Sequence, residues 1–311
     1  MKAVGTETAT EGRFQPLEPG LWGILATPFR DPDLAVDVDS LRKLVGFYRL
    51  VGARGVVALG VLGEAARLDS AERDLVLRTV VEAAHGMPVV VGMSAMATAP
   101  AVEEARRSVA AGARACMVLV STNDPGQLAA HLGQIGRRAG CGIVIQDHPM
   151  NTGVVISPER LAVAATASDV AVAIKAEAAP TAPAVAALTS EADIPVFGGL
   201  GGVSLLDELT AGSAGAMTGF AFPEALIATL DAWHDGGFDA ARAAYLPWLP
   251  LAVFEAQNKV SLAIRKEILR RRGLIADASI RPPGLNLPAS LVPLLDKHCE
   301  SVAEFAVAVR A

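Results

Sequence analysis

One lysine in this chain lies in an unusual setting. Lys175 ends the apolar run Val170–Ile174, and Glu177 follows two residues later. Apolar surroundings disfavour a charged amine and favour its neutral form, which can attack a carbonyl carbon and form a Schiff base. Because side chains two residues apart on a strand point to the same face, Glu177 is predicted to orient this amine or to act as a general acid or base beside it.

Structural alternatives stay open for both side chains. Lys175 could extend to solvent at the edge of the core, or form a structural ion pair with Glu177. Glu177 could be only that partner, or a loop residue that caps the next helix. The other five lysines are predicted to lie in a tail or on amphipathic helices, where a cation reaches water. They are Lys2, Lys43, Lys259, Lys266 and Lys297. Only Lys175 therefore requires a chemical explanation.

The elements that must position Lys175 alternate regularly along the chain. Eight apolar runs of strand length are each followed by an amphipathic, alanine-rich helical pattern, which is typical of parallel βα units. Eight such units favour closure into a (β/α)8 TIM barrel, an α/β fold. The expected strands are Leu21–Thr27, Gly55–Leu59, Pro88–Met93, Ala115–Val120, Gly142–Gln146, Val170–Lys175, Pro195–Gly199 and Gly215–Gly219.

The alternation stops after about residue 235, and only helical patterns follow. We expect a disordered lead-in at residues 1–20, the barrel at residues 21–235 and a helical domain at residues 236–311. The expected helices of the last part are Phe238–Leu246, Leu251–Arg272 and Pro288–Arg310.

In a parallel barrel the active site lies where the strands end. The residues there that are suited to contact a substrate are Thr27, Gly60, Val61, Leu62, Gly63 and Gly199. Gly60 and Gly63 fit a tight turn and a carboxylate-binding turn equally well. Gln146 and His148 end the fifth strand beside Lys175, as candidates for proton transfer. The ring of His148 faces either solvent or substrate, because Pro149 keeps the preceding backbone extended.

Several motifs together resemble the dihydrodipicolinate synthase and N-acetylneuraminate lyase family of Schiff-base lyases, from about residue 20 to the end of the chain. They are Gly23–Phe29, Gly60–Glu64 with Leu68 and Glu72-Arg73 behind it, Ile174-Lys175 and Arg281-Pro282-Pro283. The resemblance implies a barrel with a C-terminal helical domain, assembled as a homotetramer or homodimer. It also implies that Lys175 forms the imine with a small 2-oxo acid such as pyruvate, without a cofactor.

The chain departs from this family at the positions that move protons. Val61 and Leu62 stand where the family usually has two hydroxyl residues, although backbone N–H groups of the loop can still hold a carboxylate. Gln146 replaces a tyrosine, and Asn151 replaces an arginine that often binds a second substrate carboxylate. The only tyrosines are Tyr48 and Tyr245, both in helical patterns. True dihydrodipicolinate synthesis and sialic acid cleavage are therefore disfavoured.

The pairing of Gln146-Asp147-x-Pro149 with Lys175-x-Glu177 is similar to a branch that dehydrates 2-keto-3-deoxy sugar acids, such as the 2-keto-3-deoxyarabonate type. We therefore expect a lyase that dehydrates such an acid or makes or breaks an aldol bond with pyruvate. The alternative is a catalytically impaired member that binds 2-oxo acids without turnover.

Composition excludes several other classes. A net charge of −6 and only 19% charged residues disfavour binding to nucleic acid or to a membrane surface. The apolar stretches are far shorter than the roughly 20 residues that span a bilayer. Three cysteines without paired spacing suggest a cytoplasmic protein with reduced thiols. Of the five histidines only His148 ends a strand, so we expect no metal site.

Overall fold

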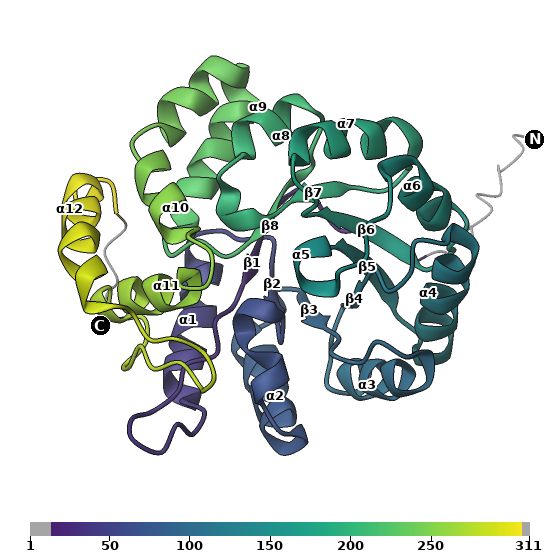
Figure 1. Cartoon of the computed structure of the whole chain (residues 1–311), viewed down its shortest axis with the longest axis horizontal. Coiled ribbons are helices and arrows are strands. Elements are labelled where there is room, and N and C mark those ends of the chain that lie inside the picture. Colours follow the sequence, from purple (N-terminus) through teal and green to yellow (C-terminus); the bar gives the residue numbers. More distant parts are fainter. Residues whose placement is uncertain (1–13, 307–311) are drawn as a thin grey trace, which may run out of the picture.

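The computed structural model describes residues 14–306. At its centre eight parallel strands form a closed barrel, in which each strand pairs with its neighbours in chain order and β8 closes on β1 (Figure 1). The strands are β1 (Gly20–Ile24), β2 (Gly55–Ala58), β3 (Val89–Gly92), β4 (Ala115–Leu119), β5 (Gly142–Asp147), β6 (Ala171–Ala176), β7 (Val196–Gly198) and β8 (Gly215–Thr218). The predicted fold is confirmed, and each strand end lies within three residues of its predicted position.

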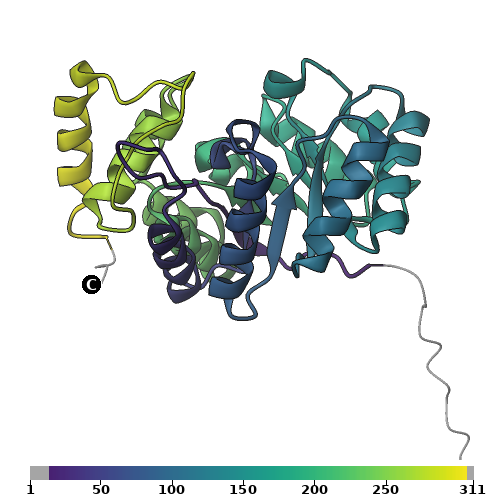
Figure 2. The ribbon, with the colours of Figure 1, turned by 90° about the horizontal axis from the view of Figure 1, so that it is seen from below.

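Helices surround the barrel on its outside (Figures 1 and 2). They are α1 (Val38–Leu50), α2 (Ser70–Ala84), α3 (Thr98–Ala110), α4 (Pro125–Ala139), α6 (Pro158–Thr166), α7 (Thr181–Glu191), α8 (Leu205–Thr210) and α9 (Pro223–Tyr245). The short α5 (Pro149–Thr152) lies instead at the mouth of the barrel, after β5. Polar caps determine where several of them begin. Asp37, Asp124 and Ser157 each accept a hydrogen bond from a backbone N–H of the first turn, and Asp69 forms a capping box with Glu72.

The apolar residues form two layers around the strands. Because the strands are buried on both faces, they are almost continuously hydrophobic. One layer fills the barrel interior with side chains such as Trp22, Val57, Met117 and Phe197. The other layer lies between the strands and the surrounding helices. The interior is therefore a packed core, and room for chemistry is left only where the strands end.

Leu17, which lies within the predicted lead-in, packs against the barrel. Leu17 is 4% exposed, belongs to the interior layer with Trp22, and its N–H donates to the carbonyl of Val172 over 3.1 Å. A single leucine between prolines and polar residues carries no periodic signal, so the sequence did not indicate this contact. The rest of the predicted lead-in, residues 1–13, lies outside the described residues.

The C-terminal helices pack together at one side of the barrel (Figures 1 and 2). They are α10 (Leu249–Glu255), α11 (Ser261–Arg271) and α12 (Val292–Val302). The single helix predicted at Leu251–Arg272 is therefore wrong: residues 256–260 separate α10 from α11, and Lys259 has a left-handed φ of 71°. This break brings Ala256, Asn258 and Ser261 to the mouth of the barrel.

Two further expectations for this part have different outcomes. The predicted helix Pro288–Arg310 contains α12, but its end at Arg310 lies outside the described residues. The division into domains at residue 235 stays a prediction, and the nearest irregularity is Gly237, where α9 leaves helical geometry.

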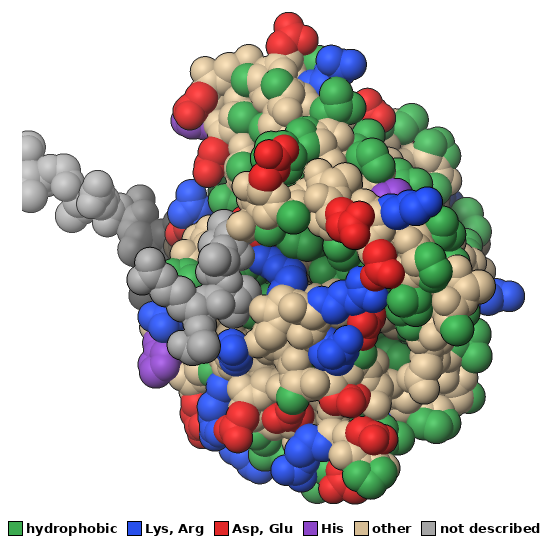
Figure 3. Space-filling view, turned by 90° about the vertical axis from the view of Figure 1, so that its left-hand side faces the viewer, with side chains coloured by type: hydrophobic (Ala, Val, Ile, Leu, Met, Phe, Trp, Pro, Cys, Tyr) green, Lys and Arg blue, Asp and Glu red, His purple; other side chains and the backbone are tan. Residues whose placement is uncertain are grey.

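Figure 3 shows the face on the side of α12, where acidic and basic side chains are interspersed and neither sign dominates. Within residues 14–306, no helix is both long enough and apolar enough to cross a membrane.

Candidate active site

Lys175 lies near the end of β6, between Gln146 on β5 and Phe197 on β7, which are its neighbours in strand register. The residue is 4% exposed, but its side chain is not sealed in the core. It lines a cavity of about 460 Å³ at the mouth of the barrel. That volume is in the range of small-molecule sites. The barrel thus presents one amine to a cavity that is open at the mouth and large enough for a small substrate.

Glu177 lies directly beside this amine. Its Oε2 is 3.0 Å from Nζ of Lys175 and accepts a 2.7 Å hydrogen bond from Nε2 of Gln146. Burial by itself would raise the pKa of the Glu177 carboxyl, but Lys175, His148 and the Gln146 hydrogen bond outweigh burial and leave the pKa below its usual value. Glu177 is therefore ionised at neutral pH, within reach of a proton from Lys175.

Gly199 supports Glu177 rather than lining the cavity. A Cβ at Gly199 would lie 2.5 Å from Cγ and 2.6 Å from Oε1 of Glu177, so any other residue would displace the carboxylate. Gly199 is absent from the lining of the Lys175 cavity. The structure thus gives no support to direct substrate contact by Gly199, and indicates close packing against Glu177.

His148 and Asp147 follow each other but face different surroundings. His148 lines the cavity, and its Nδ1 is buried without a hydrogen-bond partner among the described residues. Burial lowers the pKa of His148, with Lys175 acting in the same direction and Glu177 opposing it, so the ring is neutral at neutral pH. Asp147 is buried outside the cavity lining, and burial, supported by the charge of Glu177, raises its pKa to about 6.

The loop after β2 forms another wall of the cavity. Gly60, Val61 and Leu62 line it, whereas Gly63 does not. Val61–Gly63 is a single 3-10 turn, and the hydroxyl of Thr27 donates a 2.7 Å hydrogen bond to the carbonyl of Gly63. Thr27 is buried and absent from the cavity lining. Its hydroxyl holds the turn in place, which differs from the expected contact with substrate.

Asn151 faces a neighbouring space. It lines a second cavity of about 470 Å³, which shares Gly60, Val61 and Gln146 with the first. Neither cavity is lined by a tyrosine: Tyr48 lies on α1 and Tyr245 on α9, where its hydroxyl donates to the carbonyl of Gly202. Within residues 14–306, no group of three or more His, Cys, Asp or Glu side chains could hold a metal ion.

Sequence reasoning missed the contribution of the C-terminal helices to this cavity. Arg265 on α11 lines it together with Asn258 and Ser261. Arg265 is 3% exposed, and its Nε donates a 2.6 Å hydrogen bond to Oε1 of the buried Glu255. On an amphipathic helix an arginine normally faces water, so nothing in the sequence distinguished this one.

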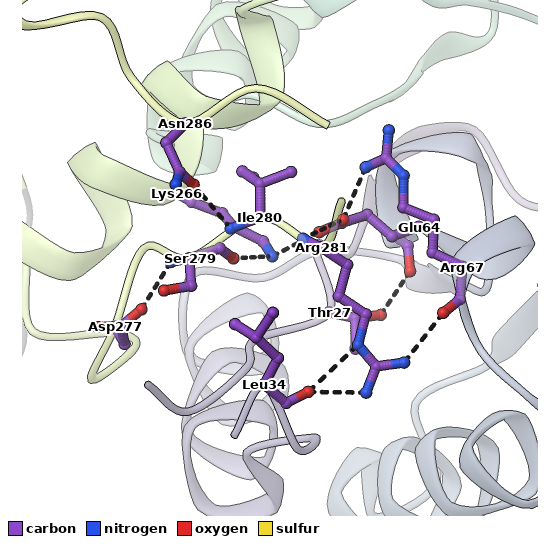
Figure 4. A network of polar contacts seen from close by, with 11 residues as sticks. Thr27, Leu34, Glu64, Arg67, Lys266, Asp277, Ser279, Ile280, Arg281 and Asn286 are labelled. Carbon is purple, nitrogen blue, oxygen red and sulfur yellow. Dashed lines mark hydrogen bonds and ion pairs between the residues drawn. The ribbon is translucent and has the colours of Figure 1, made fainter. Parts of the chain in front are cut away.

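Lys266 was also predicted wrongly. Instead of reaching water it is fully buried, and its Nζ lies 2.6 Å from Oε1 of Glu64 and 2.8 Å from the carbonyl of Ser279 (Figure 4). Nζ also lies 4.3 Å from the ring centre of Phe29. Burial lowers the pKa of Lys266, while Glu64 opposes this effect. The pattern of α11 alternates charged and apolar residues, so it did not reveal which charged residue meets the barrel.

Arg281 completes the contact between this helical region and the loop after β2. Its backbone N–H donates to Oε2 of Glu64, and its guanidinium donates to the carbonyls of Leu34 and Arg67 (Figure 4). The guanidinium also donates to Oε2 of Glu72. Glu64 itself has a left-handed φ of 54°. Several residues that carry the family resemblance thus hold the cavity-lining loop against the C-terminal helices.

A family model described as "Dihydrodipicolinate synthetase family" matches residues 18–299. The chain belongs to this family. The dihydrodipicolinate synthetase family includes solved structures close to this one: the dihydrodipicolinate synthase of Rhodopseudomonas palustris superposes with a TM-score of 0.87 at 31% identity, covering 94% of this chain and 100% of that one. The recognition made from the motifs is therefore confirmed.

Relatives in the family carry different names. L-2-keto-3-deoxyarabonate dehydratase of Azospirillum brasilense is 28% identical over 278 residues, or 86% of this chain and 89% of that protein. 4-Hydroxy-tetrahydrodipicolinate synthase of Methanothrix thermoacetophila is 30% identical over 289 residues, or 90% of this chain and 92% of that protein. The chain is thus similar both to a dehydratase of a keto-deoxy sugar acid and to synthases. Membership of the family supports the prediction that this protein is a lyase.

Proposed function

We propose that this protein is a Schiff-base lyase that acts on a small 2-oxo acid, and that it dehydrates a 2-keto-3-deoxy sugar acid or makes or breaks an aldol bond with pyruvate. One observation carries the proposal: Lys175 lines a cavity at the barrel mouth, and a carboxylate oxygen lies 3.0 Å from its Nζ. A purely structural ion pair needs no such space. Similarity to the keto-deoxy sugar acid dehydratase favours dehydration between the two reactions.

In the first step Lys175 passes a proton to Glu177, and the neutral amine attacks C2 of the substrate. The carbonyl oxygen leaves as water, with one proton from the amine and one from Glu177, and a protonated imine joins Nζ to C2. The positive nitrogen then withdraws electrons from C3. Glu177, now a carboxylate, removes the C3 proton, and the C–H electron pair forms an enamine.

In dehydration the enamine expels the oxygen on C4, which takes the proton held by Glu177 and leaves as water. Hydrolysis of the imine then releases the product and restores Lys175. Gln146 fixes Oε2 of Glu177 throughout, because its amide donates to that oxygen over 2.7 Å. This arrangement assigns to Glu177 the proton transfers for which the family usually has a tyrosine.

The loop after β2 supports binding of the substrate carboxylate. Gly60, Val61 and Leu62 line the cavity, and a Cβ at Gly60 would project toward Ile24 and Met117, so glycine leaves that volume open. The N–H groups at the start of a 3-10 turn have no partner within the turn and suit a carboxylate oxygen. Val61 and Leu62 would then act through their backbone, and apolar side chains there would exclude water from the imine.

The same departures disfavour dihydrodipicolinate synthesis and sialic acid cleavage for this protein. Asn151 cannot form the charge-assisted bonds that an arginine offers a second carboxylate. The absence of a tyrosine from either cavity lining removes the usual proton carrier. These observations also favour the second candidate, a family member that binds 2-oxo acids without turnover.

Borohydride trapping tests the proposal. Incubation with pyruvate and borohydride should add a reduced three-carbon adduct, and peptide mass spectrometry should locate it on Lys175. Lys266 is an internal control, because its amine is fully buried. The absence of a Lys175 adduct with pyruvate and other 2-oxo acids would disprove the imine mechanism. An adduct without any dehydration or retro-aldol cleavage of 2-keto-3-deoxy sugar acids would instead support the second candidate.

A further inference from the structure

The cavity has a second cation, and its guanidinium is incompletely satisfied. The only side-chain hydrogen bond that Arg265 makes with the described residues runs from Nε to Oε1 of Glu255. Its Nη1 is buried and has no hydrogen-bond partner among those residues. A buried donor without a partner costs about 1–3 kcal/mol, so a ligand oxygen that accepts from Nη1 would recover a hydrogen bond that the free protein lacks.

The end of β8 leaves room for this guanidinium. A Cβ on Gly219, the residue after β8, would lie 2.4 Å from Nη1 of Arg265 and 2.9 Å from the carbonyl oxygen of Ile24, and of these two groups the guanidinium can move more easily. A side chain at this position would therefore push the guanidinium away from the barrel mouth. Glycine at position 219 and arginine at position 265 thus form one arrangement, in which a helix outside the barrel delivers a hydrogen-bond donor to the cavity of Lys175.

Charge determines what kind of oxygen fits. Each cation of the cavity already has one carboxylate partner, because Lys175 pairs with Glu177 and Arg265 pairs with Glu255. A 2-oxo acid brings one carboxylate of its own. A second carboxylate at Arg265 would place an additional negative charge close to Glu255, and the cavity lining holds no third Lys or Arg to balance it. An uncharged oxygen such as a hydroxyl accepts the same hydrogen bond without that cost.

We propose that Arg265 binds an uncharged oxygen, a hydroxyl in the natural substrate, at the end of the 2-oxo acid chain remote from Lys175. This inference rests on the proposed function, since it takes the imine at Lys175 as the other point of attachment. It selects monocarboxylic, hydroxylated 2-oxo acids and excludes diacids. Arg265 is then a residue that determines specificity, and Gly219 is a positioning residue for it.

Three unreactive 2-oxo acids of similar length separate the possible distal groups. 5-Methoxy-2-oxopentanoate has an acceptor oxygen and no hydroxyl that could close a ring. 2-Oxoheptanoate has CH₂ in place of that oxygen, and 2-oxoadipate has a carboxylate there. For each acid, borohydride trapping over a concentration series gives the half-maximal concentration for the Lys175 adduct. Pyruvate, which has no distal group, reports the imine step alone.

In the wild type the methoxy acid should reach half-maximal trapping at a concentration about tenfold lower than 2-oxoheptanoate, because one hydrogen bond to a charged donor separates them. Arg265→Lys keeps a cation beside Glu255 but removes Nη1, and should reduce this preference to within about twofold. Gly219→Ala keeps Arg265 and displaces its guanidinium, and should do the same if Arg265→Lys does not fold. Arg270→Lys, an exposed substitution on the same helix, should preserve the preference.

Three results would overturn the inference while leaving the imine mechanism intact. Equal trapping of the methoxy acid and 2-oxoheptanoate would show that Nη1 binds no distal oxygen. Tighter trapping of 2-oxoadipate would show that the site recognises a second carboxylate. Weaker trapping of pyruvate in Arg265→Lys would place Arg265 at the C1 carboxylate. If the wild type forms no pyruvate adduct at all, the proposed function fails, and the inference about Arg265 fails with it.

Discussion

Lys175 and Lys266 are both buried and each pairs with a glutamate, but their surroundings differ. Lys175 lies 3.0 Å from Glu177, and Lys266 lies 2.6 Å from Glu64. Lys266 also bonds to the carbonyl of Ser279 and is fully enclosed, whereas Lys175 has no second polar partner among the described residues and borders a cavity.

The difference shows that burial beside a carboxylate does not by itself indicate catalysis. Every donor direction of a structural ammonium has to be satisfied by the protein, because an uncompensated buried charge is costly. An amine that reacts with a substrate must instead have one side that faces the cavity and is not occupied by a protein acceptor. The open side of Lys175 therefore distinguishes it from Lys266, and four predictions can break or sharpen this contrast.

The largest effect is expected at Lys175. Lys175→Ala should abolish turnover and borohydride trapping, because no other amine lines the cavity among the described residues. The midpoint of urea unfolding should be measured alongside, because this variant also leaves the buried Glu177 without its cation. Initial rates with a 2-keto-3-deoxy sugar acid and intact-mass spectra check this. Residual turnover within tenfold of wild type would contradict a nucleophilic role.

At Glu177 we expect a loss of catalysis with binding retained. Glu177→Gln keeps the size of the side chain and removes its ability to carry a proton, so turnover should fall about 10²–10⁴-fold, the range typical of a lost general acid or base. Pyruvate trapping should persist, although more slowly. Asp147→Asn is the matched control, because this carboxylate lies outside the cavity lining. Unchanged turnover in Glu177→Gln would assign Glu177 to ion pairing alone.

Lys266 should affect stability instead of chemistry. Lys266→Ala leaves Oε1 of Glu64 buried without its partner, while Arg67 still pairs with Oε2, so the free energy of unfolding should fall by about 1–3 kcal/mol in urea titrations. The double variant Glu64→Gln with Lys266→Met removes both charges and should recover part of this loss. At a temperature where the single variant is folded, its Lys175 should still be trapped by pyruvate. Loss of trapping in folded Lys266→Ala would remove the distinction between the two lysines.

The smallest effect concerns Glu208, a buried carboxyl that has no cation partner among the described residues. Burial raises its pKa to about 7, and the negative charge of Glu177 contributes. Because the folded-state pKa lies above the unfolded value, this group favours folding below pH 4.5, and its contribution is lost as the pH rises toward 7.

The unfolding temperature of Glu208→Gln minus that of wild type should therefore be larger at pH 8 than at pH 5. Thermal melts at both pH values measure this difference. Thr181→Val is a useful comparison, because it removes the hydroxyl that donates to Oε1 of Glu208 and keeps the carboxyl itself. A pH-independent difference between wild type and Glu208→Gln would show that Glu208 is ionised in the folded protein throughout this range.

The sequence alone determined the barrel and the place of Lys175 in it. Strands buried on both faces have nearly continuous apolar runs, so eight runs separated by helical patterns indicate eight βα units. The carboxyl ends of those runs meet at one edge, which brings Gln146, His148, Lys175 and the Gly60–Leu62 turn to a common cavity. These relations follow from local periodicity and from the geometry of a parallel sheet.

Only the tertiary structure decided which polar residues face that cavity. Arg265 and Lys266 are adjacent on α11, yet the first reaches the cavity lining and the second pairs with Glu64 in a sealed site. Likewise Thr27 bonds to the carbonyl of Gly63, and Gly199 makes room for Glu177. Such contacts join residues far apart in the chain, and the rotation of a helix against a barrel depends on how all the side chains between them pack.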